Sequence, residues 1–112
     1  MVLIDEVREK FELDRVEFTK HATVRSLARN ISVREIREAI ATGEVIEDYP
    51  DDKYGPSCLI FGCTNSERRL HIQCSDPSRD VVKIITVYEP DPEEWIEFKQ
   101  RKPKDDAEQR ME

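Results

Sequence analysis

Apolar residues recur at helical spacing in two stretches near the start of the chain. In residues 2–13 they lie three or four positions apart, which predicts an amphipathic helix. A second helix is predicted from a Thr19 cap to about Asn30, which closes it in a left-handed conformation. When its residues are placed at steps of about 100°, four apolar side chains share one arc that we expect to face the core: Val24, Leu27, Ala28 and Ile31. His21 and Arg25 then border the core.

The third helix has the clearest signals. Ser32 and Glu35 form a capping box before a stripe of apolar residues, and Gly43 ends the helix. Alternating polarity, interrupted by loops rich in Asp, Gly and Pro, then predicts four strands: residues 44–49, 58–64, 69–75 and 81–88. The last strand is apolar on both faces, and we therefore expect it to be central in the sheet.

The two middle strands are expected to form a hairpin whose faces differ in polarity. One face is predicted to pack on the helices; it carries Leu59, Phe61, Cys63, Leu70, Ile72 and Cys74. The other face is polar; it carries Cys58, Ile60, Gly62, Thr64, Arg69, His71, Gln73 and Ser75. From this assignment we expect one buried cluster to contain Phe61, Ile72, Ile84 and Ile36.

The end of the chain indicates one more helix. Asp91 and Pro92 are typical of a cap and a first helical residue, and two acids follow. Its apolar anchors are Trp95, Ile96 and Phe98. Residues 102–112 lack an apolar pattern and are predicted to be a disordered acidic tail. The sequence therefore predicts a single α+β domain over residues 1–101: N-terminal helices packed on a four-stranded, mostly antiparallel sheet, with a short C-terminal helix.

The composition narrows the classes of function. The chain has 112 residues, of which 38% are charged, and a net charge of −7. This charge disfavours non-specific binding to nucleic acid, which needs a basic surface, although a small basic pocket is compatible with it. No apolar run is long enough to span a membrane, and the first ten residues carry acids where a secretion signal has bases. Three cysteines, an odd number, favour a reducing, cytoplasmic location without disulfides.

Five motifs give the chain a family resemblance. They are FTKHATVR, ISVREI, GEVIEDYPDDKYGPSCLIFG, LHIQCS and ITVYEPDPEEW, in this order over about residues 18–101. With them the chain resembles a family of small prokaryotic proteins, domain of unknown function 4258 (DUF4258), which has no settled activity. That family looks related to the RelE-, ParE- and BrnT-like toxins, which pack N-terminal helices on an antiparallel sheet. Some of these toxins cleave mRNA and are neutralised by an antitoxin protein. The resemblance thus implies a toxin-like component of a toxin–antitoxin pair.

A toxin of this kind acts as a metal-independent ribonuclease, and the chain contains residues for that chemistry. Attack by the RNA 2′-hydroxyl needs a base and an acid, for which His21 and His71 are candidates. Arg25 can stabilise the charge that develops on phosphate, and Tyr88 can stack on a base or donate a proton. Three further residues are candidates for binding the RNA: Arg69, Arg101 and Tyr54.

Each candidate also has a structural interpretation. His21 can bond to backbone at the helix border, His71 can be a solvated strand residue, and Tyr88 can be a core or edge aromatic. Arg25 can pair with a nearby acid. The acidic net charge favours an alternative function, a non-enzymatic module of the same fold that binds a protein partner. What separates the two functions is whether the four catalytic candidates meet in one basic cleft.

Four residues carry atoms that could bind zinc: Cys58, Cys63, His71 and Cys74. Their spacing is poor, because residues an odd number of positions apart on a strand face opposite sides. We therefore interpret the thiols as small apolar residues and expect neither metal nor cofactor. A group of acidic residues can bind a divalent cation or a basic partner, or simply form a solvated loop, which is the favoured interpretation: Glu47, Asp48, Asp51 and Asp52.

Overall fold

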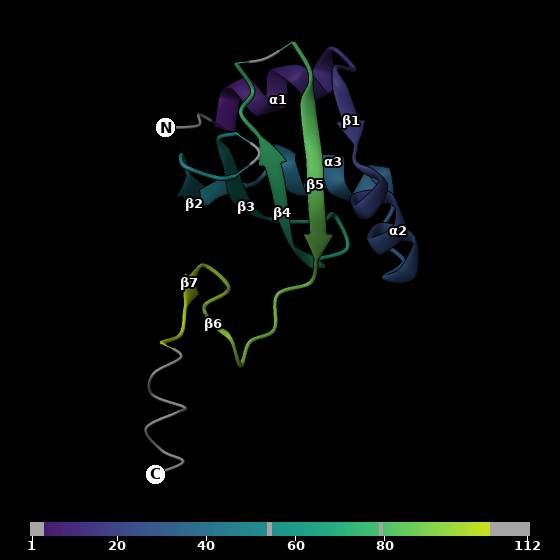
Figure 1. Ribbon diagram of the computed structural model, residues 1–112. Helices are drawn as coiled ribbons and strands as arrows, with labels where there is room; N and C mark the ends of the chain where they lie inside the picture. Colours follow the sequence, from purple (N-terminus) through teal and green to yellow (C-terminus); the bar gives the residue numbers. More distant parts are fainter. Residues whose placement is uncertain (1–3, 54, 79, 104–112) are drawn as a thin grey trace.

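Residues 4–53, 55–78 and 80–103 are described by a computed structural model, and within them the chain has an α+β fold (Figure 1). The helices of this part are α1 (Ile4–Glu12), α2 (Lys20–Ala28) and α3 (Val33–Ala41). A five-stranded sheet contains β1 (Val16–Phe18), β2 (Glu44–Tyr49), β3 (Ser57–Cys63), β4 (Arg69–Ser75) and β5 (Val82–Tyr88). A separate small hairpin consists of β6 (Trp95–Ile96) and β7 (Gln100–Arg101).

The sheet has one strand more than the sequence predicted. Its order is β1-β5-β4-β3-β2, and β1 pairs with β5 in parallel while the other pairings are antiparallel. Strand β5 was expected to be central; it is an interior strand between β1 and β4, but the central strand is β4. With three residues, β1 is too short to show alternation, and only its register with β5, Val16 opposite Val82, identifies it as a strand.

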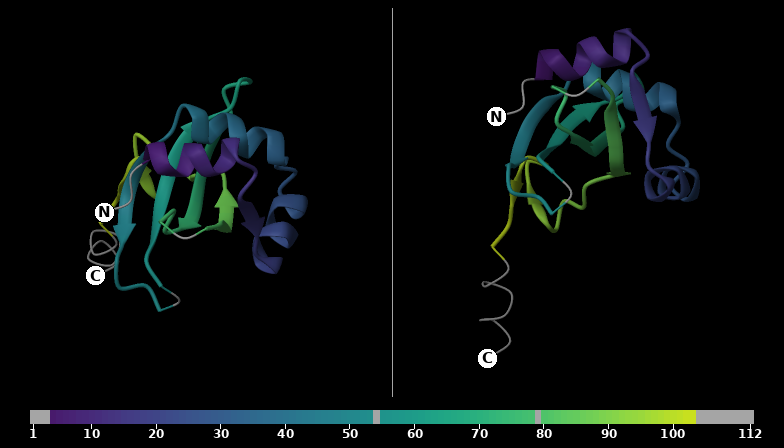
Figure 2. Two further views of the ribbon diagram at one scale, coloured as in Figure 1. Left: turned by 90° about the horizontal axis from the view of Figure 1, so that it is seen from above. Right: turned by 45° about the horizontal axis from the view of Figure 1, so that its top comes forward.

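The elements form layers around the sheet. Helices α1 and α3 cover one face, here called the helix side, and the β6–β7 hairpin lies against the other, here called the outer face (Figure 2). Helix α2 continues along the β5 edge where β1 ends. There Thr19 N–H donates to the Ile84 carbonyl (3.1 Å), and the Arg29 guanidinium donates to the Val87 carbonyl (2.7 Å). These bonds pair backbone groups that would otherwise form a free sheet edge.

The caps of α2 and α3 are where the sequence predicts them. The Thr19 hydroxyl accepts a hydrogen bond from Ala22 N–H (3.0 Å), and Asn30 is left-handed with φ 55°. Ser32 and Glu35 form the predicted capping box, with reciprocal bonds of 3.1 and 3.0 Å.

The buried face of α2 differs from the predicted one. Ala22 and Ser26 face the protein, whereas Val24 and Leu27 are exposed. The small side chains of Ala22 and Ser26 let α2 lie close to the β5 edge. This approach brings Thr19 N–H and the Arg29 guanidinium within hydrogen-bond distance of β5 carbonyls. The predicted core face of α2 is therefore wrong. Of the four residues assigned to it, only Ile31 is buried.

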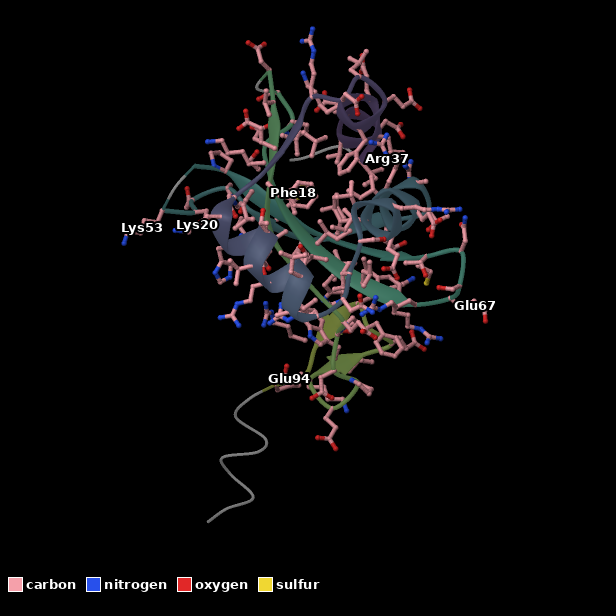
Figure 3. The ribbon with its side chains drawn as sticks, turned by 90° about the vertical axis from the view of Figure 1, so that its right-hand side faces the viewer. Phe18, Lys20, Arg37, Lys53, Glu67 and Glu94 are labelled. Carbon is pink, nitrogen blue, oxygen red and sulfur yellow. The ribbon has the colours of Figure 1, made fainter. Side chains whose placement is uncertain are left out.

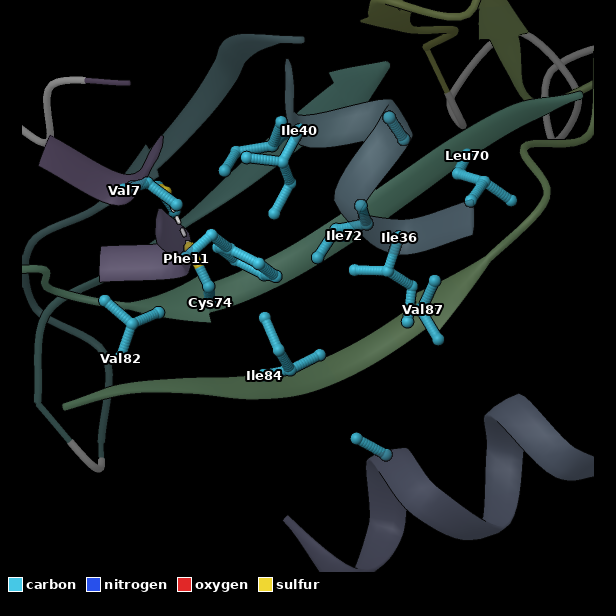
Figure 4. Close-up of a cluster of buried hydrophobic side chains, with 14 of the residues drawn as sticks. Val7, Phe11, Ile36, Ile40, Leu70, Ile72, Cys74, Val82, Ile84 and Val87 are labelled. Carbon is cyan, nitrogen blue, oxygen red and sulfur yellow. Dashed lines mark hydrogen bonds between the residues drawn. The ribbon is translucent and has the colours of Figure 1, made fainter. Parts of the chain in front are cut away.

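The helix-side core contains Ile36, Ile72 and Ile84, as expected (Figure 4). Phe61 was wrongly assigned to it. The register pairs Phe61 with His71 and Ile60 with Ile72, so β3 presents the opposite alternation to the helices. Strand β3 has apolar residues at both odd and even positions, so its sequence alone does not show which set faces the helices. Gly62 decides this. A Cβ at Gly62 would lie 1.9 Å from the Ala39 carbonyl oxygen of α3, so only glycine fits under this helix.

The predicted C-terminal helix is absent from the described residues. Its start signals form a single turn, in which Glu94 and Trp95 N–H both donate to the Asp91 carbonyl. The chain then makes a hairpin turn with positive φ at Glu97 (52°) and Phe98 (65°), a conformation of type I′ that a helix cannot contain. No helix in the described ranges is long and apolar enough to cross a bilayer. Most of the predicted tail, residues 104–112, lies outside those ranges.

Candidate functional site

Three neighbouring strands bring aromatic side chains together on the outer face. Phe61 of β3 is the register partner of His71 of β4, and His71 is the partner of Tyr88 of β5. The β6–β7 hairpin adds Trp95 and Phe98 over them. The His71 ring meets Trp95 edge to face with centroids 4.4 Å apart, and Phe61 stacks on Phe98 at 6.2 Å. We call these five residues the hairpin cluster.

His71 is fully buried at the centre of the hairpin cluster (0% exposed). Its Nε2 lies 2.5 Å from the Phe98 carbonyl oxygen, and its Nδ1 lies 3.1 Å from the Tyr88 hydroxyl. A carbonyl can only accept, so Nε2 carries the proton and Nδ1 accepts from Tyr88. Burial lowers the pKa of His71, against the opposing effect of its bond to the Phe98 carbonyl, and burial raises the pKa of Tyr88. The pair is therefore neutral near pH 7, with both ring nitrogens occupied.

An ion pair lies at the edge of the hairpin cluster. Arg101 Nε donates to both Glu47 oxygens (2.9 and 3.2 Å), and its guanidinium lies 4.7 Å from the Trp95 ring centroid. The Tyr49 hydroxyl donates to the same Glu47 carboxylate. Burial and this bond raise the pKa of Tyr49 to about 12, and the bond to Glu47 raises the pKa of Arg101. Glu47 thus joins β2 to the hairpin.

A surface hollow of about 570 Å³ lies beside this ion pair; it is lined by Tyr49, Pro50, Asp51, Asp52, Gln73 and Arg101. The Ser57 hydroxyl donates to Asp52 (2.8 Å) at its base, which satisfies that carboxylate from within the protein. Two acids and one paired arginine give the hollow no net positive charge for a phosphate. Nowhere in the described part of the chain do three or more His, Cys, Asp or Glu side chains gather as a metal site.

The remaining catalytic candidates lie elsewhere. His21 and Arg25 are exposed on α2, and their side chains form no hydrogen bond or ion pair with any residue that the structure describes. Figure 3 labels Lys20 at the start of α2, on the outside of the molecule. His71 contacts the hairpin cluster and neither of these two residues.

The structure thus brings together part of the predicted set. His71 and Tyr88 are bonded to each other, and Arg69 and Arg101 both lie at the hairpin, with the Arg69 guanidinium 4.7 Å from the Phe98 ring centroid. Tyr54 lies outside the described residues. Whether any of them acts on RNA stays a prediction.

The sequence predicts no site role for three residues of the hairpin cluster: Phe61, Trp95 and Phe98. Trp95 and Phe98 are predicted instead to anchor a C-terminal helix, and Glu47 is predicted only as part of an acidic group. Two large aromatic residues in an otherwise polar segment, Trp95 and Phe98, do indicate that the segment covers an apolar surface. The alternation pattern does not reveal that this surface is the outer face, because it assigns Phe61 to the helix side.

A comparison with protein-family models found a match for this chain. The profile described as Domain of unknown function (DUF4258) matches residues 18–89, most of the chain. The chain belongs to the DUF4258 family. The DUF4258 match contains α2, α3, His71 and Tyr88, but it ends before the hairpin, short of the expected limit at residue 101. Comparisons with curated proteins and with solved structures found no match, so the relation to RelE-like toxins stays a prediction.

Proposed function

We propose that this DUF4258 chain is a protein-binding module and that α2 is its docking surface. The observation that carries the proposal is the exposure of two large apolar residues on one side of α2, Val24 (56%) and Leu27 (77%). Single exposed apolar residues are normal on a protein surface. These two are three positions apart, so they are neighbours on the helix surface, and the fold gives them nothing to cover.

The charges on α2 define the partner. The helix contains no acid, although the whole chain has a net charge of −7. At about 100° per residue, Lys20 lies in line with the Val24–Leu27 pair, one turn before it, and His21 with Arg25 lies along one side of the pair. A complementary partner is therefore a segment with apolar anchors bordered by carboxylates, such as an acidic amphipathic helix.

Site-specific photo-crosslinking in the native cell tests the surface. A photoreactive amino acid at position 27 should give an adduct with one protein, and the same residue at position 33 should not. Val33 is the control because it is also an exposed aliphatic residue (53%, against 77% for Leu27) but lies on α3. Equal adducts at both positions, or none at position 27, would contradict the proposal.

The recombinant pair then tests the chemistry. Leu27→Ser should weaken binding about tenfold or more, since burying a leucine contributes about 1.5–3 kcal/mol. Val33→Ser should leave the Kd unchanged. Arg25→Glu should also weaken binding, and the loss of affinity should be larger at low salt than at high salt, because the contribution of Arg25 is electrostatic. An adduct protein without an acidic, apolar segment would exclude the proposed partner class.

A toxin-like, metal-independent ribonuclease is the second candidate, with an antitoxin as the partner. It is favoured by the basic flank of α2, where His21, Arg25 and Arg29 are four residues apart and therefore lie in one row. In this interpretation Arg25 binds phosphate and His21 accepts the 2′-hydroxyl proton. His71 and Tyr88 reach a substrate only after the hairpin has left them.

Cleavage of labelled RNA in EDTA tests the second candidate. His21→Ala should lower the rate about 100-fold, the usual scale for a general base. Arg25→Lys should also lower it, because lysine cannot form the two-pronged contact with phosphate. Val33→Ser again serves as the control. Absence of cleavage by the wild type, or equal rates for all variants, would exclude this candidate.

A further inference from the structure

Two thiols face each other on neighbouring strands of the sheet, β3 and β4. Cys58 of β3 and Cys74 of β4 are direct register partners, and their Sγ atoms lie 3.6 Å apart. Both side chains are fully buried in the helix-side core. Figure 4 shows the sulfur contact as a dashed line beneath Val7 and Phe11 of α1. The third cysteine, Cys63, is half-buried at the end of β3 and has opposite parity.

The backbone already has the geometry that a disulfide needs. Opposed residues of an antiparallel pair have Cα atoms about 4.5–5.5 Å apart, within the range that disulfides span. Both side chains point to the same side of the sheet. The sulfurs must approach by about 1.5 Å to reach bonding distance, a shift that side-chain rotation supplies without moving the strands.

We propose that Cys58 and Cys74 are a site of oxidative modification, at which hydrogen peroxide or a similarly small peroxide converts the two thiols into a disulfide. This site is independent of the α2 surface. Only a small oxidant suits it, because a bulkier disulfide reagent would have to place its own substituent inside the packed core.

The reaction has two steps. One thiolate attacks a peroxide oxygen and displaces hydroxide, which takes up the proton released by the thiol and leaves as water; the attacking sulfur becomes a sulfenic acid. The second thiol then attacks that sulfur, and the hydroxyl group leaves with its proton as a second water. Two thiols are oxidised and one peroxide is reduced to two waters. The hydrogen bond to Cys58, together with burial, raises the pKa of Cys74. The balance of the reaction is the same whichever of the two thiols attacks first.

The product would staple β3 to β4. The two residues are 16 positions apart, so the bond closes a loop of moderate length. Restricting the unfolded chain in this way should raise the melting temperature by about 10 °C. Helix α1 covers the thiols, held by Arg8, which donates to the Ile40 carbonyl (3.1 Å) and the Gly43 carbonyl (2.8 Å). Access of the peroxide thus depends on transient opening of α1.

Mass spectrometry of the full chain after peroxide treatment tests the proposal. Free thiols are alkylated under denaturing conditions, and the digest is analysed without reduction. The expected result is a linked pair of peptides containing Cys58 and Cys74, with Cys63 outside the link, reversed by dithiothreitol. Cys63→Ala should form the same link, and Cys58→Ala should form none. The melting temperature should rise in the wild type and in Cys63→Ala only.

Two results would overturn the proposal. One is a link that includes Cys63. The other is a Cys58–Cys74 pair that stays fully alkylatable while Cys63 is oxidised, both in the wild type and in Val7→Ala, which thins the α1 cover. Faster linking in Val7→Ala than in the wild type is the result expected from the α1 cover.

Discussion

The two faces of the sheet are closed in different ways. On the helix side, α1 and α3 seal an aliphatic layer in which Leu70 and Ile72 are fully buried. On the outer face, a hairpin with two-residue strands seals an aromatic layer around His71. Strand β4 contributes to both layers by simple alternation. The helix side is held by non-directional apolar burial, whereas the outer face depends on a few directed hydrogen bonds and ring contacts.

This difference bears on which part of the molecule opens first. The helix-side layer is built almost entirely within the DUF4258 match, except for α1. The cover of the outer face lies outside the match, because Trp95, Phe98 and Arg101 follow residue 89. We therefore expect the hairpin to open more readily than the helix-side core, and four experiments test that contrast.

The largest effect is expected on the helix side. Ile72→Ala should lower the free energy of unfolding by about 2–5 kcal/mol, because it removes a fully buried side chain and leaves a cavity. Denaturant unfolding followed by far-UV circular dichroism measures it. A loss under about 1 kcal/mol would mean that this face is not the main core.

Phe61→Ala should have a smaller effect. A fully buried phenylalanine contributes about 3–5 kcal/mol, and the half-buried Phe61 should contribute about 2 kcal/mol. Its loss removes the stacking partner of Phe98, so the hairpin should loosen as well. The chain has a single tryptophan, Trp95, whose fluorescence reports the hairpin directly. Equal costs for Phe61→Ala and Ile72→Ala would remove the contrast between the faces.

Tyr88→Phe should cost about 1 kcal/mol, the usual value for one hydrogen bond, because it leaves Nδ1 of His71 without its donor. The loss should appear as a red shift of Trp95 emission before global unfolding. Tyr49→Phe is a useful comparison, because Tyr49 bonds Glu47 at the edge rather than His71. If Tyr88→Phe changed neither stability nor fluorescence, the hydrogen bond from Tyr88 to His71 would not contribute to holding the hairpin.

The smallest effect is a dependence on pH. Burial lowers the pKa of His71 below the value of 6.5 for an unperturbed histidine, so the unfolded chain takes up the proton more readily. The stabilising contribution of His71 is therefore complete above about pH 6.5 and decreases as the pH falls toward the lowered pKa.

Unfolding free energies measured between pH 5 and pH 8 test this dependence. The wild type and His21→Gln should lose stability below pH 6.5, since both retain His71; position 21 is exposed on α2, away from His71. His71→Gln should be flatter over the same interval. A wild-type profile that rises as the pH falls below 6.5 would show that His71 is charged in the folded protein.

The sequence by itself determined the elements whose signals are local. A cap acts within three residues, so Thr19 and the Ser32–Glu35 box marked their helices correctly. The two faces of β4 were equally readable, because polar and apolar residues alternate there and His71 stayed opposite Leu70 and Ile72.

Only the tertiary structure decided the orientation of segments with apolar residues at both parities or on several sides. In β3, contact between Gly62 and Ala39 turned Phe61 to the outer face. In α2, the need to approach the β5 edge buried Ala22 and exposed Leu27. At the C-terminus, the aromatic surface left on the outer face favoured a hairpin over the continuation of a single helical turn. In each case the deciding contact joins residues that are distant in the sequence, and a local sequence pattern does not contain information about such contacts.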